Sequence, residues 1–191
     1  MMLSILIPSI PERLHQLKDI IETYERYIDF CGLNGMVEII AIVDNKQRSV
    51  GTKSNNLLAI AEGDYVVRSD DDDRLTQFYF QSIYEACEKR VDVITYLQDA
   101  RINDVRTTVH FGLKNENQEF QTNGITLRPA WHCCTWKREF LIENEVHFSN
   151  TNYGEDDTFQ RLANEKAQTS CHINEVCHVY IHDFTKTAAF Q

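Results

Sequence analysis

The sequence predicts an α/β fold, because buried strands and amphipathic helices alternate from its beginning. Short apolar runs at residues 3–7, 37–43 and 65–68 are rich in β-branched residues, which is typical of strands in a parallel sheet. The segments between them repeat apolar residues three and four positions apart, as one face of a helix requires. This strand–helix–strand order implies parallel pairing with right-handed crossovers.

The first strand leads into a predicted loop, Pro8-Ser9-Ile10-Pro11, and a helix follows from about Glu12. The apolar face of this helix is expected to consist of Leu14, Leu17, Ile21, Tyr24 and Ile28. Gly32 is a typical helix stop. The second strand ends at Asp44, and a short helix at residues 52–61 leads to the third strand. The resulting βαβαβ order is typical of a nucleotide-binding half.

The pattern changes after residue 98, where helix and strand no longer alternate regularly. The elements expected beyond the third strand are a helix at 75–89, a strand at 91–96, antiparallel strands and loops over 99–130, a short helix at 136–144, a helix at 155–166 and a strand at 171–182. A chain of 191 residues is expected to form one domain, residues 1–191.

Composition narrows the class of protein. A net charge of −10 disfavours a nucleic-acid partner, which would need a basic face. No apolar run reaches the roughly 18 residues that suggest a transmembrane segment. The N-terminus lacks the basic region of a signal peptide, so we expect a cytoplasmic protein whose six cysteines stay reduced.

Four consecutive aspartates, Asp70–Asp73, follow the third strand. The carboxyl end of such a strand faces the crevice where α/β sheets bind ligands. Adjacent carboxylates repel one another, and Mg²⁺ or Mn²⁺ shared with a substrate diphosphate would offset that repulsion. The alternative is a solvated acidic loop that precedes the next helix. Because both common glycine-rich phosphate loops are absent, a metal could anchor the diphosphate in their place.

Three segments together resemble the GT-A glycosyltransferases, in particular glycosyltransferase family 2. They are the stretch from Gly51 through Lys53 and Asn55 to Asp70–Asp73, the segment YGEDDTFQRL at 153–162, and Tyr180-Ile181-His182. The resemblance covers residues 3–183. It implies a Rossmann-like, nucleotide-sugar-binding half at 1–98, a mixed central sheet, and a small acceptor-side and catalytic half at 99–191. Ser54 departs from the family, in which many members have arginine before the asparagine.

The resemblance implies a metal-dependent, inverting transfer of a hexosyl or pentosyl group from a nucleoside-diphosphate sugar, with a UDP-sugar expected. The acceptor would be a glycan or another hydroxyl compound. Asp72 and His182 are the expected ligands of Mn²⁺ or Mg²⁺, and the four-residue run leaves Asp71 and Asp73 as alternates. His178 is the alternate histidine, because it lies on the same predicted strand.

Donor-binding positions are carried over from the same resemblance. They are expected to include Pro8, Ser9, Arg13, Asp44, Lys53, Asp70, Asp71 and His132. Asp44 would accept a hydrogen bond from the uracil or the ribose. Its alternative role is that of an ordinary aspartate beginning a loop. For Arg13 and Lys53 the alternative is a solvated surface charge.

Asp156 is the expected general base, which removes the proton of the attacking hydroxyl. Glu155 is expected to orient the acceptor. The alternative is that both acids merely occupy the first turn of a helix, where negative charge is favoured. A zinc site built from Cys171, His172, Cys177 and His178 is a weaker alternative, because the cysteine pairs lack the usual spacing.

Two other functions fit the same residues. One is a nucleotide- or carbohydrate-binding module without turnover, and the other is a nucleotidyltransferase, which would also use carboxylates and Mg²⁺. The absence of an early glycine-rich loop speaks against the second. The joint presence of Asp156 and His182 speaks against the first.

Overall fold

The structure is a computed structural model that describes residues 1–103 and 105–182. A nine-stranded sheet forms its centre, in the order β2-β1-β3-β8-β5-β6-β7, with β9 beside β5 and β4 beside β9. The strands are β1 (Leu3–Ser9), β2 (Val37–Val43), β3 (Tyr65–Arg68), β4 (Arg74–Leu75), β5 (Val93–Ile102), β6 (Val105–Phe111), β7 (Ile125–Arg128), β8 (Thr135–Lys137) and β9 (Ser170–His182).

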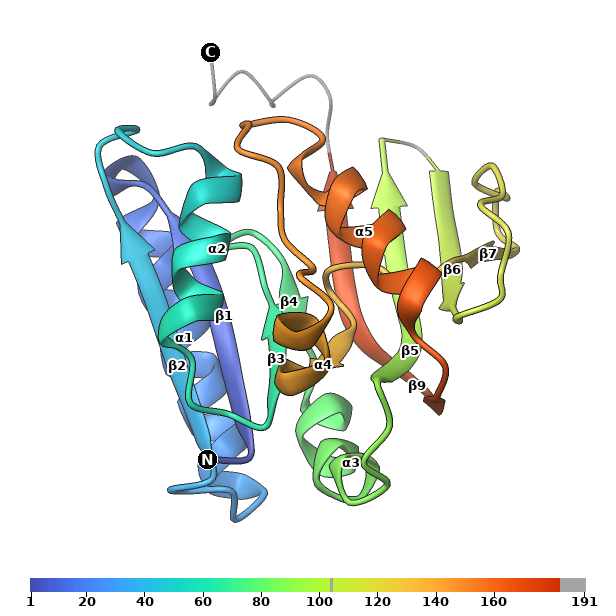
Figure 1. Cartoon of the computed structure of the whole chain (residues 1–191), viewed down its shortest axis with the longest axis horizontal. Helices are drawn as coiled ribbons and strands as arrows, with labels where there is room; N and C mark the ends of the chain where they lie inside the picture. Colours follow the sequence, from blue (N-terminus) through green and yellow to red (C-terminus); the bar gives the residue numbers. More distant parts are fainter. Residues whose placement is uncertain (104, 183–191) are drawn as a thin grey trace.

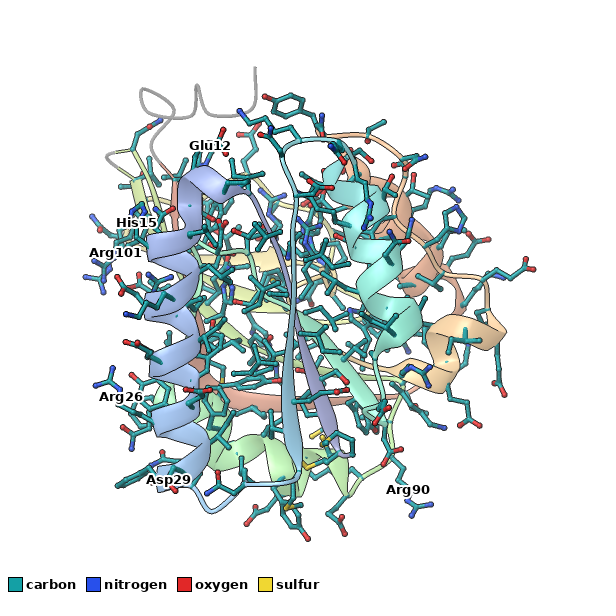
Figure 2. The ribbon with its side chains drawn as sticks, turned by 90° about the vertical axis from the view of Figure 1, so that its left-hand side faces the viewer. Glu12, His15, Arg26, Asp29, Arg90 and Arg101 are labelled. Carbon is teal, nitrogen blue, oxygen red and sulfur yellow. The ribbon has the colours of Figure 1, made fainter. Side chains whose placement is uncertain are left out.

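Helices cover both faces of the sheet. They are α1 (Leu14–Phe30), which follows a 3-10 turn at Pro11–Arg13, then α2 (Val50–Ile60), α3 (Gln77–Cys87), α4 (Arg138–Glu143) and α5 (Glu155–Lys166). Figure 1 shows α2, α4 and α5 in front of the sheet, and in Figure 2 α1 and α2 lie on opposite sides of it. The architecture is therefore a three-layer α/β domain.

Strand β1 explains why two cores form. Ile5 and Ile7 pack against α1 and α3, whereas Leu6, between them, packs in a second core with residues of α2, α4 and α5. Side chains of a strand alternate between the two faces of its sheet, so a continuous apolar run serves both layers. Every residue of β1 is buried.

The predicted parallel arrangement of the first three strands is confirmed, since β1 pairs in parallel with β2 and with β3. Beyond β3 the sheet is mixed. Strand β8 runs antiparallel to β3 and β5, and β5 runs antiparallel to β6. The expectation of only antiparallel strands over residues 99–130 is wrong for β7, which pairs in parallel with β6.

Several predicted boundaries need correction. Pro8 and Ser9 belong to β1 rather than to a loop, because pairing with β2 continues to Ser9 opposite Val43. A proline is tolerated there because β3, on the other flank of β1, ends opposite Leu6. Residue 136, predicted to begin a helix, lies in β8, before α4. The strand predicted at 91–96 is β5, and it extends to Ile102 because β6 and β9 pair along its length.

The predicted face of α1 is also corrected at two positions. Leu14 is 52% exposed, and Ile20 is fully buried instead of Ile21. The helix therefore presents Leu17, Ile20, Tyr24 and Ile28 to the sheet. None of the helices in the described part of the chain has the length and apolar character of a membrane span.

Candidate active site

The candidate active site lies where the carboxyl ends of β1 and β3 meet the beginning of α5. Ser9 ends β1, and the aspartates directly follow the neighbouring strand β3. Ser9 Oγ donates a 2.5 Å hydrogen bond to Asp71 Oδ2, and Arg13 Nη1 lies 2.7 Å from Asp71 Oδ1. The turn after β1 therefore holds the acidic segment in place.

The four aspartates differ in their surroundings. Asp70 pairs with Arg68 at 2.8 Å, Asp71 pairs with Arg13 at 2.7 Å and Asp73 pairs with His178 at 3.4 Å, all largely inside the protein. Asp72 pairs with Arg13 at 3.0 Å and is the most exposed, with 45% of its side chain accessible. Partial burial, together with the charges of Asp70 and Asp73, raises the pKa of Asp72 to about 6.

Arg68 connects the aspartates to helix α5. Its side chain is 5% exposed, Nη2 lies 2.8 Å from Asp70 Oδ1, and Nη1 lies 2.9 Å from Glu155 Oε1. Burial raises the pKa of Asp70, but the charge and hydrogen bond of Arg68 together with the charge of His132 outweigh burial, so the pKa of Asp70 is lowered. One buried guanidinium thus joins the end of β3 to the first residue of α5.

Asp156 faces the cleft from the first turn of α5. Trp131 Nε1 donates a 2.8 Å hydrogen bond to Asp156 Oδ2, and His132 Nδ1 lies 3.1 Å from the same oxygen. Burial alone would raise the pKa of Asp156, but His132, Trp131 and Arg68 lower it well below its usual range. The carboxylate therefore stays ionised at neutral pH, as a proton acceptor must be.

Asp44 is a further carboxylate of the site and directly follows β2. Both of its oxygens are buried, and neither has a hydrogen-bond partner among the described residues. Lys53 Nζ lies 3.4 Å from Asp44 Oδ1 and donates a 2.7 Å hydrogen bond to the Ser9 carbonyl. The Lys53 side chain is only 3% exposed, so its charge is used within the protein. Asp44 therefore retains acceptor capacity for a ligand.

The segment that contains Gly51, Lys53 and Asn55 fastens α2 to the loop before α5. Gly51 N donates to the Thr151 carbonyl at 3.1 Å, and Asn55 exchanges two 2.9 Å hydrogen bonds with the backbone of Phe148. The loop backbone continues into α5 through a 3.0 Å bond from Ser149 N to the Glu155 carbonyl. This motif therefore positions the helix that carries Asp156.

We expect Gly51→Ala to destabilise the protein by about 1–3 kcal/mol, the usual range for overpacking. A Cβ at Gly51 would lie 1.8 Å from the Ser149 carbonyl oxygen and 3.1 Å from Glu155 Cβ, so backbone must move. Urea unfolding measures the loss. Gly124→Ala is the control, because its new Cβ comes no closer than 3.1 Å to another atom, Gln121 Cβ, and meets backbone oxygens only at 3.7 Å and beyond. Equal losses in both variants would contradict this prediction.

The C-terminal strand β9 brings two histidines and a tyrosine to the cleft. His178 is fully buried, with Nδ1 2.8 Å from Gln98 Nε2 and Nε2 facing Asp73. The rings of Tyr180 and His182 are stacked, with centroids 5.8 Å apart. Burial alone would lower the pKa of His178, but the Asp73 carboxylate raises it to about 9. His178 is therefore a cation at neutral pH.

The raised pKa of His178 predicts a specific pH dependence of stability. The folded state retains this proton more tightly than the unfolded chain, whose histidine pKa is about 6.5. The stabilisation is therefore complete below about pH 6.5 and is lost as pH rises through about 9. Urea unfolding of the wild type and of His178→Gln between pH 6 and 9.5 should show a difference that shrinks with rising pH. A constant difference would contradict the assignment.

A cleft of about 470 Å³ brings part of this set together, and Asp44, Asp71 and Asp72 are not among its lining residues. Asp70, Asp73, Glu155, Asp156 and His182 all line it, together with His132. Among residues 1–103 and 105–182, no three His, Cys, Asp or Glu side chains are grouped as a preformed metal site. The residues nevertheless suit a cation whose shell a substrate completes, since Asp72 offers an exposed carboxylate in a crowded negative field.

The structure brings most of the predicted site residues together and adds others. Arg68 and Gln98 were not predicted, although a charged residue ending an apolar strand was a usable signal for the first. Nothing in the local sequence marked Gln98 as the partner of His178. All six cysteines are free, and five of them lie in the buried cores, at positions 87, 133, 134, 171 and 177.

The chain has the GT-A fold found in glycosyltransferases, which confirms the predicted fold class. No protein-family model matches the sequence, and no curated protein matches it. Solved structures do match. TarS 1-349 of S. aureus has a TM-score of 0.63 at 14% identity, covering 95% of this chain and 60% of that one. TarS 1-349 has also been solved in complex with UDP-GlcNAc and with UDP.

Two further structures share the fold. Mannosyltransferase PcManGT from Pyrobaculum calidifontis, in complex with GDP-Man and Mn²⁺, has a TM-score of 0.52 at 13% identity, covering 97% of this chain and 58% of that one. A197 from STIV has a TM-score of 0.50 at 17% identity, covering 91% and 82%. The chain thus spans about 60% of the length of TarS 1-349.

Proposed function

We propose that this protein is an inverting, metal-dependent glycosyltransferase that uses a nucleoside-diphosphate sugar, with UDP-sugar as the donor. One observation carries the proposal: Asp70 and Asp73, from the aspartate run after β3, line the same cleft as the ionised Asp156 on α5. The first group suits a cation and a diphosphate, and the second suits removal of a proton. The fold of the neighbours and the ligands in their structures agree with this proposal.

The donor would lie across the carboxyl ends of β1, β2 and β3. Asp44, whose two oxygens accept no hydrogen bond from the described residues, would accept hydrogen bonds from the base or the ribose. Lys53 and Ser9 would act indirectly, because both are held inside the protein beneath this position. Arg13 would hold Asp71 and Asp72 and balance part of their charge.

Asp72 would hold Mn²⁺ or Mg²⁺, and His182 lines the cleft beside Asp70 and Asp73 as the candidate second ligand. When bound, the cation would neutralise the diphosphate as it departs. Asp70 and Asp73 would shape the negative field around it while keeping their own partners, Arg68 and His178.

Asp156 would accept the proton of the acceptor hydroxyl. The hydroxyl oxygen would form a bond to the anomeric carbon while the bond from that carbon to the diphosphate oxygen breaks. The electron pair of the broken bond would leave with the diphosphate, and the hydroxyl proton would pass to Asp156 Oδ. Because the pKa of Asp156 is low, this transfer should occur late, once the new bond has made the hydroxyl strongly acidic. Trp131 and His132 would hold the carboxylate in position.

The test is a calorimetric titration with UDP in the presence and absence of Mn²⁺, with ADP, GDP and CDP as comparisons. We expect UDP binding that requires Mn²⁺ and weakens at least tenfold in Asp72→Asn. Mutation of a residue that only hydrogen-bonds to a metal ligand already lowers metal affinity about 10–100-fold, and Asp72 is the proposed ligand itself. Asp29→Asn is the control. It neutralises an exposed acid at the far end of α1, as Figure 2 shows.

The outcomes separate the alternatives. Mn²⁺-dependent binding of another nucleotide would change the donor and keep the reaction class. Binding without any transfer in a screen of sugar donors would favour a module without turnover. If no nucleotide binds with any divalent cation, the proposal is wrong. Membership of family 2 remains a part of this proposal that a UDP-dependent inverting activity would support.

A further inference from the structure

The cleft extends beyond the acidic residues toward the edge of the sheet that β7 forms. Its far part is lined by side chains of β5, β6 and β7 and of the loop before β7. This wall is apolar and aromatic, with Ile102, Val109, Phe111 and Phe120. Arg128, at the end of β7, supplies the positive charge of this wall.

Arg128 is held in place by neutral groups. Its guanidinium lies over the Phe120 ring, with Cζ 4.5 Å from the ring centroid, and Nη1 donates to Asn117 Oδ1. The Nε atom is buried without a hydrogen-bond partner among the described residues. Burial lowers the pKa of Arg128, and no carboxylate counteracts that effect. A buried donor without a partner is costly unless a ligand supplies an acceptor.

The two arginines that line the cleft are therefore different. Arg68 is neutralised by Asp70 and Glu155, at 2.8 and 2.9 Å. Arg128 has no carboxylate partner within the described part of the chain, although the protein carries a net charge of −10. An arginine in that state presents a planar fork suited to a phosphate or carboxylate group.

The position of Arg128 indicates that a phosphate or carboxylate group bound there would belong to the acceptor rather than to the donor. In the sheet order, β7 is the edge strand opposite to β2, and β2 leads to Asp44 on the donor side. Asp156 lies in the same cleft as Arg128. A ligand held at Arg128 can thus approach Asp156 without occupying the place proposed for the nucleotide.

We infer that the acceptor carries a phosphate or carboxylate group that Arg128 binds, while its sugar or apolar portion packs on the wall around Phe120. This inference rests on the proposed function, since it names the acceptor class of that site. Arg128 would act as a specificity residue, because a neutral acceptor would leave the buried Nε without a partner.

The test uses small probes and the tryptophan fluorescence of the purified protein, since one of its two tryptophans, Trp131, lines the cleft. Glycerol 3-phosphate and D-glucuronate are titrated beside their neutral counterparts, glycerol and D-glucose. We expect an anionic probe to bind at least about tenfold more tightly than its counterpart, and this preference to disappear in Arg128→Gln. The probe that binds identifies the anion as phosphate or carboxylate.

Arg26→Gln is the matched control, because it removes the same charge from the outer surface of α1 (Figure 2), and Arg26 is not a lining residue of the cleft. It should leave every affinity within about twofold. Arg128→Lys, which keeps the charge and loses the fork, should show intermediate affinity and covers the case in which Arg128→Gln does not fold. Thermal unfolding checks that each variant is folded.

Three results would overturn the inference: neutral probes that bind as well as anionic ones, an anion affinity unchanged in Arg128→Gln, or UDP affinity reduced by that substitution. The last would place Arg128 on the donor diphosphate. The two proposals fail separately. Absence of UDP binding contradicts the transferase function, whereas the probe titrations judge the Arg128 site in the same protein.

Discussion

Replacing Asp156 with asparagine is expected to lower the turnover for sugar transfer by about 10²–10⁴-fold, the usual contribution of a general base. Asparagine keeps the shape of the side chain, and its Oδ1 can still accept the hydrogen bond from Trp131 Nε1. It cannot accept the proton of the attacking hydroxyl. UDP affinity should stay within about threefold, because the proposed donor contacts are Asp44 and the cation at Asp72 rather than Asp156. Rates of UDP release and calorimetric titration measure the two effects.

Asp157→Asn is the control for this experiment. It makes the same chemical change one residue further along the first turn of α5, at an exposed side chain. If the acids merely favour the start of the helix, the two variants should behave alike. Normal turnover in Asp156→Asn would show that another group takes the proton. Loss of UDP binding in that variant would place Asp156 on the donor.

Replacing Arg68 with methionine is expected to lower the free energy of unfolding by about 3–5 kcal/mol, as is usual when one member of a buried ion pair is removed. The substitution leaves Glu155 and Asp70 without the guanidinium that lies between them. Because the pKa of Asp70 is lowered in the folded wild type, the Arg68 contribution is present at neutral pH. It should shrink as pH falls below about 4 and Asp70 becomes protonated.

Urea unfolding at pH 7 and at about pH 3 measures this loss and its decrease in acid. Arg161→Met is the control, since Arg161 is 66% exposed on α5 and lies 3.7 Å from Glu165. An exposed pair of this kind contributes less than about 1 kcal/mol. Arg68→Lys should retain part of the stability, because one ammonium can face one of the two carboxylates. A loss below 1 kcal/mol in Arg68→Met would mean that the bridge does not hold α5 to the sheet.

The sequence predicted best where a local pattern has one structural solution. The helix at 155–166 was predicted with the bounds that α5 has, and the strand at 171–182 differs from β9 by one residue. The apolar runs predicted β1, β2 and β3 and their parallel pairing. Prediction was poorer in the second half, where short strands and turns carry weak periodicity, and where β7 pairs in parallel against expectation.

In the candidate site, too, the sequence predicted the local features and not the long-range contacts. Acids at a strand end and at a helix start are visible as local clusters, so Asp72 and Asp156 could be proposed from the sequence. Their partners could not. Arg68 and Glu155 are 87 residues apart, and Gln98 and His178 are 80 apart. No local pattern specifies which distant side chain neutralises a buried charge.

By itself, the sequence determined the fold class and the positions of the two acidic segments, because apolar periodicity and clustered charge are local properties of a chain. Only the tertiary structure decided the state of each acid. It paired Asp70 with Arg68 and Asp73 with His178, and it left the Asp44 oxygens without a hydrogen bond from the described residues. Burial and the charge of the nearest partner determine whether a carboxylate binds a cation, accepts a proton or stabilises the fold. Both properties depend on packing between residues that are far apart in the sequence.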